Sequence, residues 1–127
     1  MRNSEKYVTL RKVGGFYQCF DGDCYILYYL FNYKIVNKRC GFPHSSLSKV
    51  INVLEDKKID YKVINHHQDD IGKSYKKINQ YNHFLKLGLE KYDREAKKSL
   101  IENKIKAMPM NRIEELYHLI EDFVNEY

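Results

Sequence analysis

Side chains of two kinds alternate over residues 7–12 of the chain, a pattern typical of a β-strand with one solvated face. The run from Tyr7 to Lys12 sets Tyr, Thr and Arg against Val, Leu and Lys, and the aromatic-rich run from Phe16 to Phe20 is interpreted as a second strand. Gly14 and Gly15 separate the two runs, and consecutive glycines readily form a tight turn. We therefore expect an antiparallel hairpin.

The next stretch predicts a helix and a further strand. Residues 21–23 (Asp-Gly-Asp) supply a turn and a helix N-cap. Residues 24–31 are apolar or aromatic on every side, which predicts a largely covered helix, with a strand as the alternative. Alternation over 33–38 predicts another strand, ended by Gly41-Phe42-Pro43.

A second helix follows the helix-start residues 44–46. Its apolar positions recur at i, i+3, i+4 and i+7, namely Leu47, Val50, Ile51 and Leu54. Residues 59–64 then read as a short strand. The order ββαβαβ predicts an α/β fold, in which a mixed β-sheet is flanked by helices on one or both faces.

The C-terminal part is helical in pattern. After the loop-like residues 65–73, a helix is expected from Asn79 until Pro109 breaks it, and Asn111, with Glu114 at N3, is expected to cap the next one. Each helix carries an apolar stripe. We expect a helical hairpin whose surplus apolar surface packs on the α/β core or on a partner chain, as in a homo-oligomer.

Length and composition limit the remaining choices. The 127 residues suffice for one compact domain, which we place at 1–74, followed by a helical extension at 75–127. No apolar run reaches the length of a transmembrane helix and no signal-peptide pattern is present, so we expect a cytoplasmic protein without a membrane partner. The odd number of cysteines, three, predicts reduced and mostly buried thiols.

Charge is distributed unevenly along the chain. The net charge of +5 is made of +4 over residues 1–74, +5 over 75–110 and −4 over 111–127. Basic residues together with 12 tyrosines and six phenylalanines suit a nucleic-acid partner. The acidic last segment is expected to have a different role.

The sequence gives little support for an enzyme or for a metal site. His66, His67, Asp69 and Asp70 share one polar loop, without a nucleophile or an oxyanion donor at a recognisable spacing. No paired Cys-x-x-Cys spacing accompanies Cys40. We therefore expect a non-catalytic protein with no cofactor and no bound metal.

Several short motifs resemble one known family. They are the segment 13–20 (VGGFYQCF), the acidic turn 21–23, the segment 30–39, the tripeptide 41–43 (GFP) before a helix, and the strand 61–64. Taken in this order, over about residues 7 to 65, they are similar to the N-terminal mismatch-recognition domain of MutS proteins, which runs G-D-F-Y-E-x-F, acidic turn, helix, strand ending T-K-R, then G-[IV]-P. The resemblance implies a MutS domain I-like α/β domain.

The resemblance also implies contacts with nucleic acid. In that family the phenylalanine stacks into a mispaired base step and the glutamate binds the displaced base; Phe16 and Gln18 occupy these positions. Gln18 for Glu, Gly15 for Asp and a shortened segment after Arg39 imply altered function, with mismatch discrimination in question. Because the sequence has no Gly-rich Lys-Ser/Thr phosphate loop, we expect no ATPase activity.

Small stand-alone proteins resembling this domain are associated with diversity-generating retroelements, as accessory proteins of an error-prone reverse transcriptase. We therefore expect a DNA-, RNA- or hybrid-binding accessory protein, with Phe16 and Gln18 as base contacts. The expected phosphate contacts are Arg11, Lys12, Lys34, Lys38, Arg39 and Lys49. The alternatives are that Phe16 and its neighbours are core residues of a strand, and that the protein is an interaction adaptor or oligomerisation module that keeps the fold without binding DNA.

Overall fold

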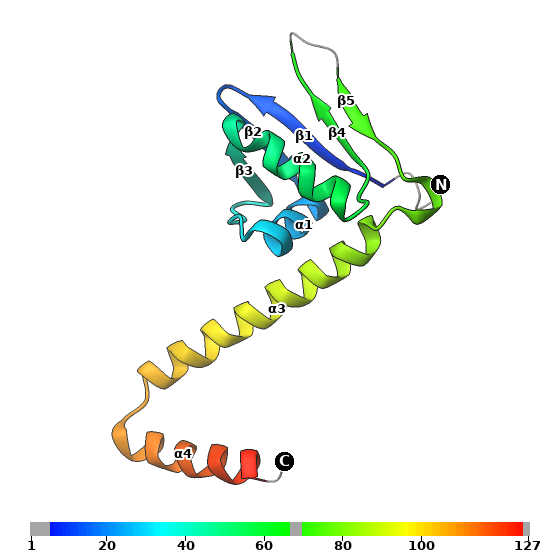
Figure 1. Ribbon diagram of the computed structural model, residues 1–127. Coiled ribbons are helices and arrows are strands. Elements are labelled where there is room, and N and C mark those ends of the chain that lie inside the picture. The colour runs from blue at the N-terminus through cyan, green and yellow to red at the C-terminus, as the bar shows by residue number, and fades with distance from the viewer. Residues whose placement is uncertain (1–5, 67–69, 126–127) are drawn as a thin grey trace. The chain divides into compact units, whose positions relative to one another are not determined.

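The computed structural model describes residues 6–66 and 70–125 (Figure 1). The chain divides into two compact units, Met1–Tyr92 and Asp93–Tyr127. The first is an α/β unit and the second consists of helices, which confirms the expected fold class. Among the described residues, no helix combines the length and the hydrophobicity needed to cross a membrane.

The first unit contains a five-stranded mixed sheet with the strand order β3-β2-β1-β4-β5. Its elements are β1 (Val8–Val13), β2 (Phe16–Phe20), α1 (Gly22–Phe31), β3 (Arg39–Pro43), η2 (His44–Ser46, a 3₁₀ helix), α2 (Leu47–Asp56), β4 (Tyr61–Ile64), β5 (Ile71–Lys73), η3 (Lys76–Ile78, 3₁₀) and the start of α3 (Tyr81–Lys106). Strand β1 is antiparallel to β2 and parallel to β4. The predicted hairpin, helices and mixed sheet are therefore present.

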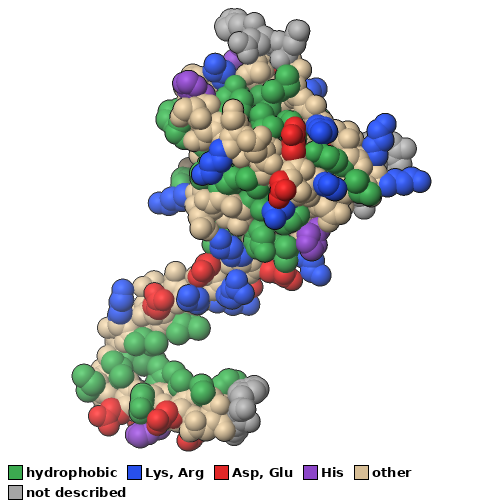
Figure 2. All heavy atoms as spheres, viewed as in Figure 1, with side chains coloured by type: hydrophobic (Ala, Val, Ile, Leu, Met, Phe, Trp, Pro, Cys, Tyr) green, Lys and Arg blue, Asp and Glu red, His purple; other side chains and the backbone are tan. Residues whose placement is uncertain are grey.

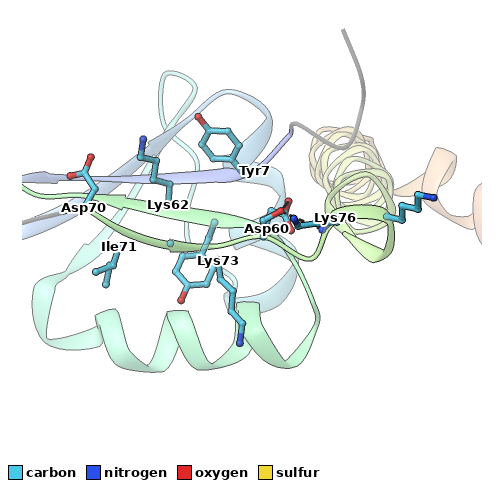
Figure 3. Close-up of a pocket in the computed structure, with 11 residues that line it drawn as sticks. Tyr7, Asp60, Lys62, Asp70, Ile71, Lys73 and Lys76 are labelled. Atoms are coloured by element: carbon cyan, nitrogen blue, oxygen red, sulfur yellow. Dashed lines mark hydrogen bonds between the residues drawn. The ribbon is translucent and has the colours of Figure 1, made fainter.

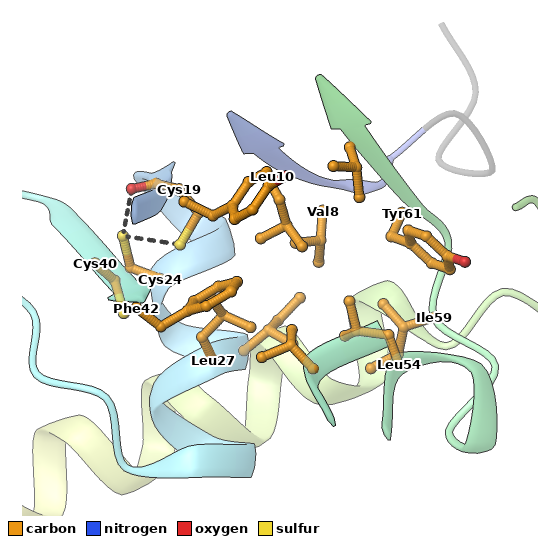
Figure 4. Close-up of a cluster of buried hydrophobic side chains, with 14 of the residues drawn as sticks. Val8, Leu10, Cys19, Cys24, Leu27, Cys40, Phe42, Leu54, Ile59 and Tyr61 are labelled. Atoms are coloured by element: carbon orange, nitrogen blue, oxygen red, sulfur yellow. Dashed lines mark hydrogen bonds between the residues drawn. The ribbon is translucent and has the colours of Figure 1, made fainter. Parts of the chain in front are cut away.

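The core lies between the sheet and helices α1 and α2 (Figure 4). Alternation along each strand sends every second side chain into it. The strand side chains in the core are Val8, Leu10, Tyr17, Cys19, Cys40, Phe42, Tyr61 and Val63. Helices α1 and α2 add Cys24, Ile26, Leu27, Val50 and Leu54. Each fully buried aliphatic or aromatic side chain contributes about 1.5–3 kcal/mol to the free energy of folding. The helices thus cover one face of the sheet.

The strand predicted at 33–38 is wrong; the strand is Arg39–Pro43. Asn37 and Lys38 have φ of 53° and 61°, and this left-handed backbone ends any extended run before Arg39. The alternation that suggested a strand has another cause. Tyr33 is half-buried because its ring stacks on Phe42, with 5.6 Å between the ring centroids.

The loop predicted at 65–73 contains strand β5, which pairs antiparallel with β4. Gly72 allows this pairing, because a Cβ at this position would lie 2.6 Å from the carbonyl oxygen of Tyr61. Only three residues long and interrupted by glycine, β5 has no alternation of its own to reveal it. His67 and Asp69, two of the residues considered for catalysis, lie outside the described residues.

The first turns of α3 belong to the α/β unit. Tyr81 is buried and donates a hydrogen bond from its hydroxyl to Asp23 Oδ1 at 2.5 Å. Gly88 lies against α1, where a Cβ would be only 2.2 Å from the carbonyl oxygen of Tyr25. The two compact units meet after Tyr92, within α3, whereas the sequence suggested a domain of residues 1–74 with a helical extension at 75–127.

The second unit contains the remainder of α3 and helix α4 (Met110–Asn125). Helix α4 begins one residue before the predicted cap Asn111, and the carbonyl of Pro109 accepts the amide hydrogen of Ile113 at 3.2 Å. None of the described side chains of α4 is buried. The two predicted helices are present, but the apolar stripe of α4 remains largely exposed.

Candidate nucleic-acid interface

One face of the sheet is directed away from α1, α2 and the core. We call it the open face. It is formed by the strand residues between the core positions: Thr9, Arg11, Val13, Phe16, Gln18, Phe20, Arg39, Gly41, Pro43, Lys62 and Ile64. None of these residues is acidic. The open face thus carries aromatic, polar and cationic side chains.

Two phenylalanines on β2 dominate the open face. Phe16 is 53% exposed and Phe20 is 38% exposed. They are four residues apart on one strand, so their Cα atoms are about 13–14 Å apart at about 3.4 Å per residue. Exposed rings on a rigid strand are suitable platforms for stacking bases.

The glycine turn accounts for the exposure of Phe16. Gly14 has φ of +60°, which L side chains rarely adopt, and the turn brings Val13 and Phe16 opposite each other. The amide of His44 donates a hydrogen bond to the carbonyl of Gly15 at 2.9 Å, which holds the turn against β3. The following residue, Tyr17, points to the core. The aromatic run therefore divides between the two faces.

Gln18 lies between the two phenylalanines and is half-buried. On β3 it faces Gly41, and a Cβ added to that glycine would lie 3.6 Å from Cγ of Gln18. The missing side chain leaves the Gln18 amide accessible from the open face. An amide both donates and accepts hydrogen bonds, so it can pair with the edge of a base.

Cations surround these three side chains. Arg11 is exposed and directly opposite Gln18. The Cζ atom of Arg39 is 5.7 Å from the centroid of the Phe20 ring, a cation–π contact. Lys62 on β4 extends the basic surface beyond β1, opposite Thr9. Phosphates of a bound strand would find positive charge on both sides of the rings.

A hollow of about 800 Å³ lies at the β4–β5 edge, and Lys62 of the open face is part of its lining (Figure 3). Tyr7 and Lys62 lie on one side of these strands, while Ile71 and Lys73 lie on the other. Asp60, also in the lining, is buried, and its carboxylate accepts hydrogen bonds from the Tyr75 amide at 2.6 Å and the Ser74 hydroxyl at 3.2 Å. Asp60 is thus occupied in holding the chain after β5.

The structure brings together four of the eight predicted contact residues: Arg11, Phe16, Gln18 and Arg39. The other four lie elsewhere. Lys12 has the same strand parity as the core residues of β1. Lys34 and Lys38 lie in the irregular segment between α1 and β3. Lys49 is on α2, where its Nζ is 5.7 Å from the ring centroid of Phe31. Because α2 covers the opposite face of the sheet, Lys49 cannot share a ligand on the open face with Phe16.

Three residues of this surface were missed by the sequence analysis. Phe20 has a detectable signal, since it has the same strand parity as Phe16 and Gln18. Tyr7 has the same kind of signal, since it shares the strand parity of Thr9 and Arg11. Lys62 has none, because its position opposite Thr9 depends on the parallel pairing of β1 with β4.

Two polar clusters lie on the core side. The carboxylate of Asp23 accepts hydrogen bonds from the Thr9 amide at 3.0 Å and from the Tyr81 hydroxyl. Burial raises the pKa of Asp23. It also raises the pKa of Tyr81, an effect to which the adjacent Asp23 charge adds. Asp23 therefore joins β1, α1 and α3.

The three cysteines are free and buried, as predicted. Cys19 and Cys24 are 3.9 Å apart between sulfur atoms, and the hydrogen bond between them, together with burial, raises the pKa of Cys19. Within residues 6–66 and 70–125, no group of three His, Cys, Asp or Glu side chains is arranged to hold a metal ion.

Comparisons of this chain with protein-family models, with curated proteins and with solved structures found no match.

Proposed function

We propose that the protein is a non-catalytic nucleic-acid-binding module and that the open face is its binding surface. One observation carries the proposal: Phe16 and Phe20 are exposed on either side of Gln18, with Arg11 and Arg39 on the same face. Rings supply base stacking, the amide supplies a hydrogen bond to a base edge, and the guanidinium groups neutralise phosphates.

The sequence motifs support the same proposal. Their similarity to the MutS mismatch-recognition domain places Phe16 and Gln18 at the base-contacting positions of that family. In this role the protein serves as an accessory subunit of a reverse transcriptase in a diversity-generating retroelement. It would handle primer, template RNA or their hybrid.

Fluorescence anisotropy tests the proposal. The purified chain is titrated against matched duplex, mismatched duplex, single strands and RNA:DNA hybrid at two salt concentrations. Phe16→Ala is expected to weaken binding to the preferred ligand about 5- to 150-fold, since stacking contributes about 1–3 kcal/mol per base. Phe16→Tyr keeps an aromatic ring and serves as the matched control.

Equal affinities of Phe16→Ala and the unsubstituted protein would reject the open face as the binding surface. Absence of binding to every ligand by the folded protein would reject the function itself. The ranking of the four ligands would identify the substrate class.

A second function, that of an interaction adaptor, is favoured by a separate observation. The apolar side chains of α4 are exposed over most of the length of the helix. Neutralising lysines among residues 75–92, which lie outside the unit that contains α4, would abolish binding if that segment contacted nucleic acid, and would leave protein association unchanged.

A further inference from the structure

Helix α4 is strongly amphipathic. At 100° per residue, Ile113, Leu116, Ile120 and Val124 fall within one narrow sector, which we call the α4 stripe. Figure 2 shows hydrophobic side chains along one side of α4 and acidic side chains on the other. The apolar side of α4 is therefore suited to packing against another apolar surface.

The α4 stripe is not covered within the described chain. Ile120 is 50% exposed and Val124 is 59% exposed, and only the residues nearest the connection to α3, Ile113 and Leu116, are half-buried. Helix α4 is 16 residues long, only just above the roughly 12–15 residues below which an isolated helix is marginal in water, and most helical stability in proteins comes from packing of the apolar face. Packing of the stripe against a partner would supply the missing stabilisation.

The part of α3 in the second unit, residues 93–106, has a similar surface. We call this part distal α3. Its Leu100 and Ile101 are exposed, and Ile105 is half-buried. The unit therefore has two incompletely covered apolar surfaces, one on each helix.

The two helices carry opposite charges. Distal α3 has five basic and three acidic residues, whereas α4 has one basic and four acidic residues. A partner that covers both helices must offer a basic amphipathic helix to α4 and an acidic amphipathic helix to distal α3. A second copy of this chain offers that combination, and two-fold symmetry would use each contact twice.

We propose that the unit Asp93–Tyr127 is the interface between two copies of the chain. The α4 stripe of each copy packs on distal α3 of the other, forming an antiparallel four-helix arrangement. The acidic helix α4 of each copy then lies against the basic distal α3 of the other. This proposal is independent of nucleic-acid binding, because it uses none of the residues of the open face.

Sedimentation equilibrium of the full chain over a concentration series tests the proposal. The expected mass is twice the 15.3 kDa of one chain. Ile120→Asp, which places a charge within the interface, is expected to raise the dimer dissociation constant at least about 100-fold. Asn111→Asp adds the same charge on the opposite side of α4 and is expected to leave the dissociation constant unchanged. Circular dichroism verifies that both variants keep their helix content.

A charge exchange tests the pairing of α4 with distal α3. One variant carries Glu114→Lys and Glu121→Lys on α4, and the other carries Lys97→Glu and Lys104→Glu on distal α3. Each alone brings like charges together across the interface and should dimerise more weakly. Mixed in equal amounts, they should form a heterodimer, because both of its α4–α3 contacts again join opposite charges.

Three results would overturn the proposal. They are a single-chain mass at every concentration, an assembly larger than two copies, and dimerisation of Ile120→Asp with unchanged affinity. Failure of the two charge variants to form a heterodimer would reject the pairing of α4 with distal α3.

Discussion

The open face of the sheet and the α4 stripe both expose large apolar side chains, but their surroundings differ. On the open face, Phe16 and Phe20 are separated by Gln18 and accompanied by Arg11 and Arg39. On α4, apolar residues follow one another along the helix, and the nearby charges are mostly acidic.

The difference indicates two kinds of partner. Separate rings on a hydrogen-bonded sheet, surrounded by cations, suit a ligand that is itself a row of flat apolar bases on an anionic backbone. A continuous stripe on a helix suits another helix, since only extended apolar contact would cover it. Exposure alone therefore does not specify a partner; the spacing and charge of the neighbouring residues do.

The largest expected effect is on the free energy of unfolding, and it differs between a buried leucine and an exposed one. Leu27 in α1 is fully buried, whereas Leu119 in α4 is 66% exposed. Leu27→Ala should lower the free energy of unfolding by about 2–5 kcal/mol, through lost burial and the cavity that remains. Leu119→Ala should change it by less than about 0.5 kcal/mol. Urea unfolding at a protein concentration below dimerisation measures both. A similar cost for Leu119→Ala would show that α4 is covered within its own chain.

A smaller effect sharpens the contrast between the two sides of the sheet. Arg11 lies on the open face and Lys49 on the helix that covers the opposite face. Arg11→Gln should weaken nucleic-acid binding and reduce the salt slope by about 0.7–0.9, the value for one lost phosphate contact. Lys49→Gln removes the same charge and should leave both quantities unchanged. Anisotropy titrations at several salt concentrations provide the slopes, and equal effects of the two substitutions would mean that binding is spread over the whole basic surface.

The smallest expected effect is a pH dependence confined to the α/β unit. Burial raises the pKa of Asp23, so folding favours its neutral form. This contribution to stability is fully present below the ordinary pKa of the carboxyl and is lost as pH rises through the pKa in the folded protein. Asp23→Asn cannot titrate. The stability of the unsubstituted protein relative to this variant should therefore fall as pH rises.

Urea unfolding of both proteins between about pH 3 and 7 measures this difference. Asp56→Asn, at a carboxylate whose side chain is 76% exposed, is the matched control. The expectation would be contradicted if the stability of the unsubstituted protein relative to Asp23→Asn stayed constant or increased as pH rises.

Local patterns predicted the elements that depend on local interactions. The glycine pair between an alternating run and an aromatic-rich run indicated the β1–β2 hairpin, and the spacing of Leu47, Val50, Ile51 and Leu54 indicated α2. The strand at β3 was misplaced because two left-handed residues, Asn37 and Lys38, carry no reliable signal in their side chains. Strand β5 was missed because three residues reveal a strand only through the neighbour they pair with.

The candidate site was predicted in part for the same reason. Phe16, Gln18 and Arg11 lie within one hairpin, so their common face follows from the turn and the alternation. Arg39 joins them through β3, and Lys62 through the parallel pairing of β1 with β4. Lys49 looked equivalent to Arg11 in the sequence, because charge alone does not reveal the face to which a residue belongs.

The sequence by itself determined that Phe16 and Tyr17 point to opposite faces, since successive side chains of a strand alternate. It also determined that α4 has one apolar side. Only the tertiary structure decided which face of the sheet is covered, because that depends on α1 and α2 packing against Val8, Leu10, Tyr17 and Cys19 across distant parts of the chain. Burial is a property of the whole packed unit, whereas alternation is a property of a few neighbouring residues. For this reason the sequence predicts that β2 has two different faces, but only the packed fold decides that the face with Phe16 is exposed to solvent.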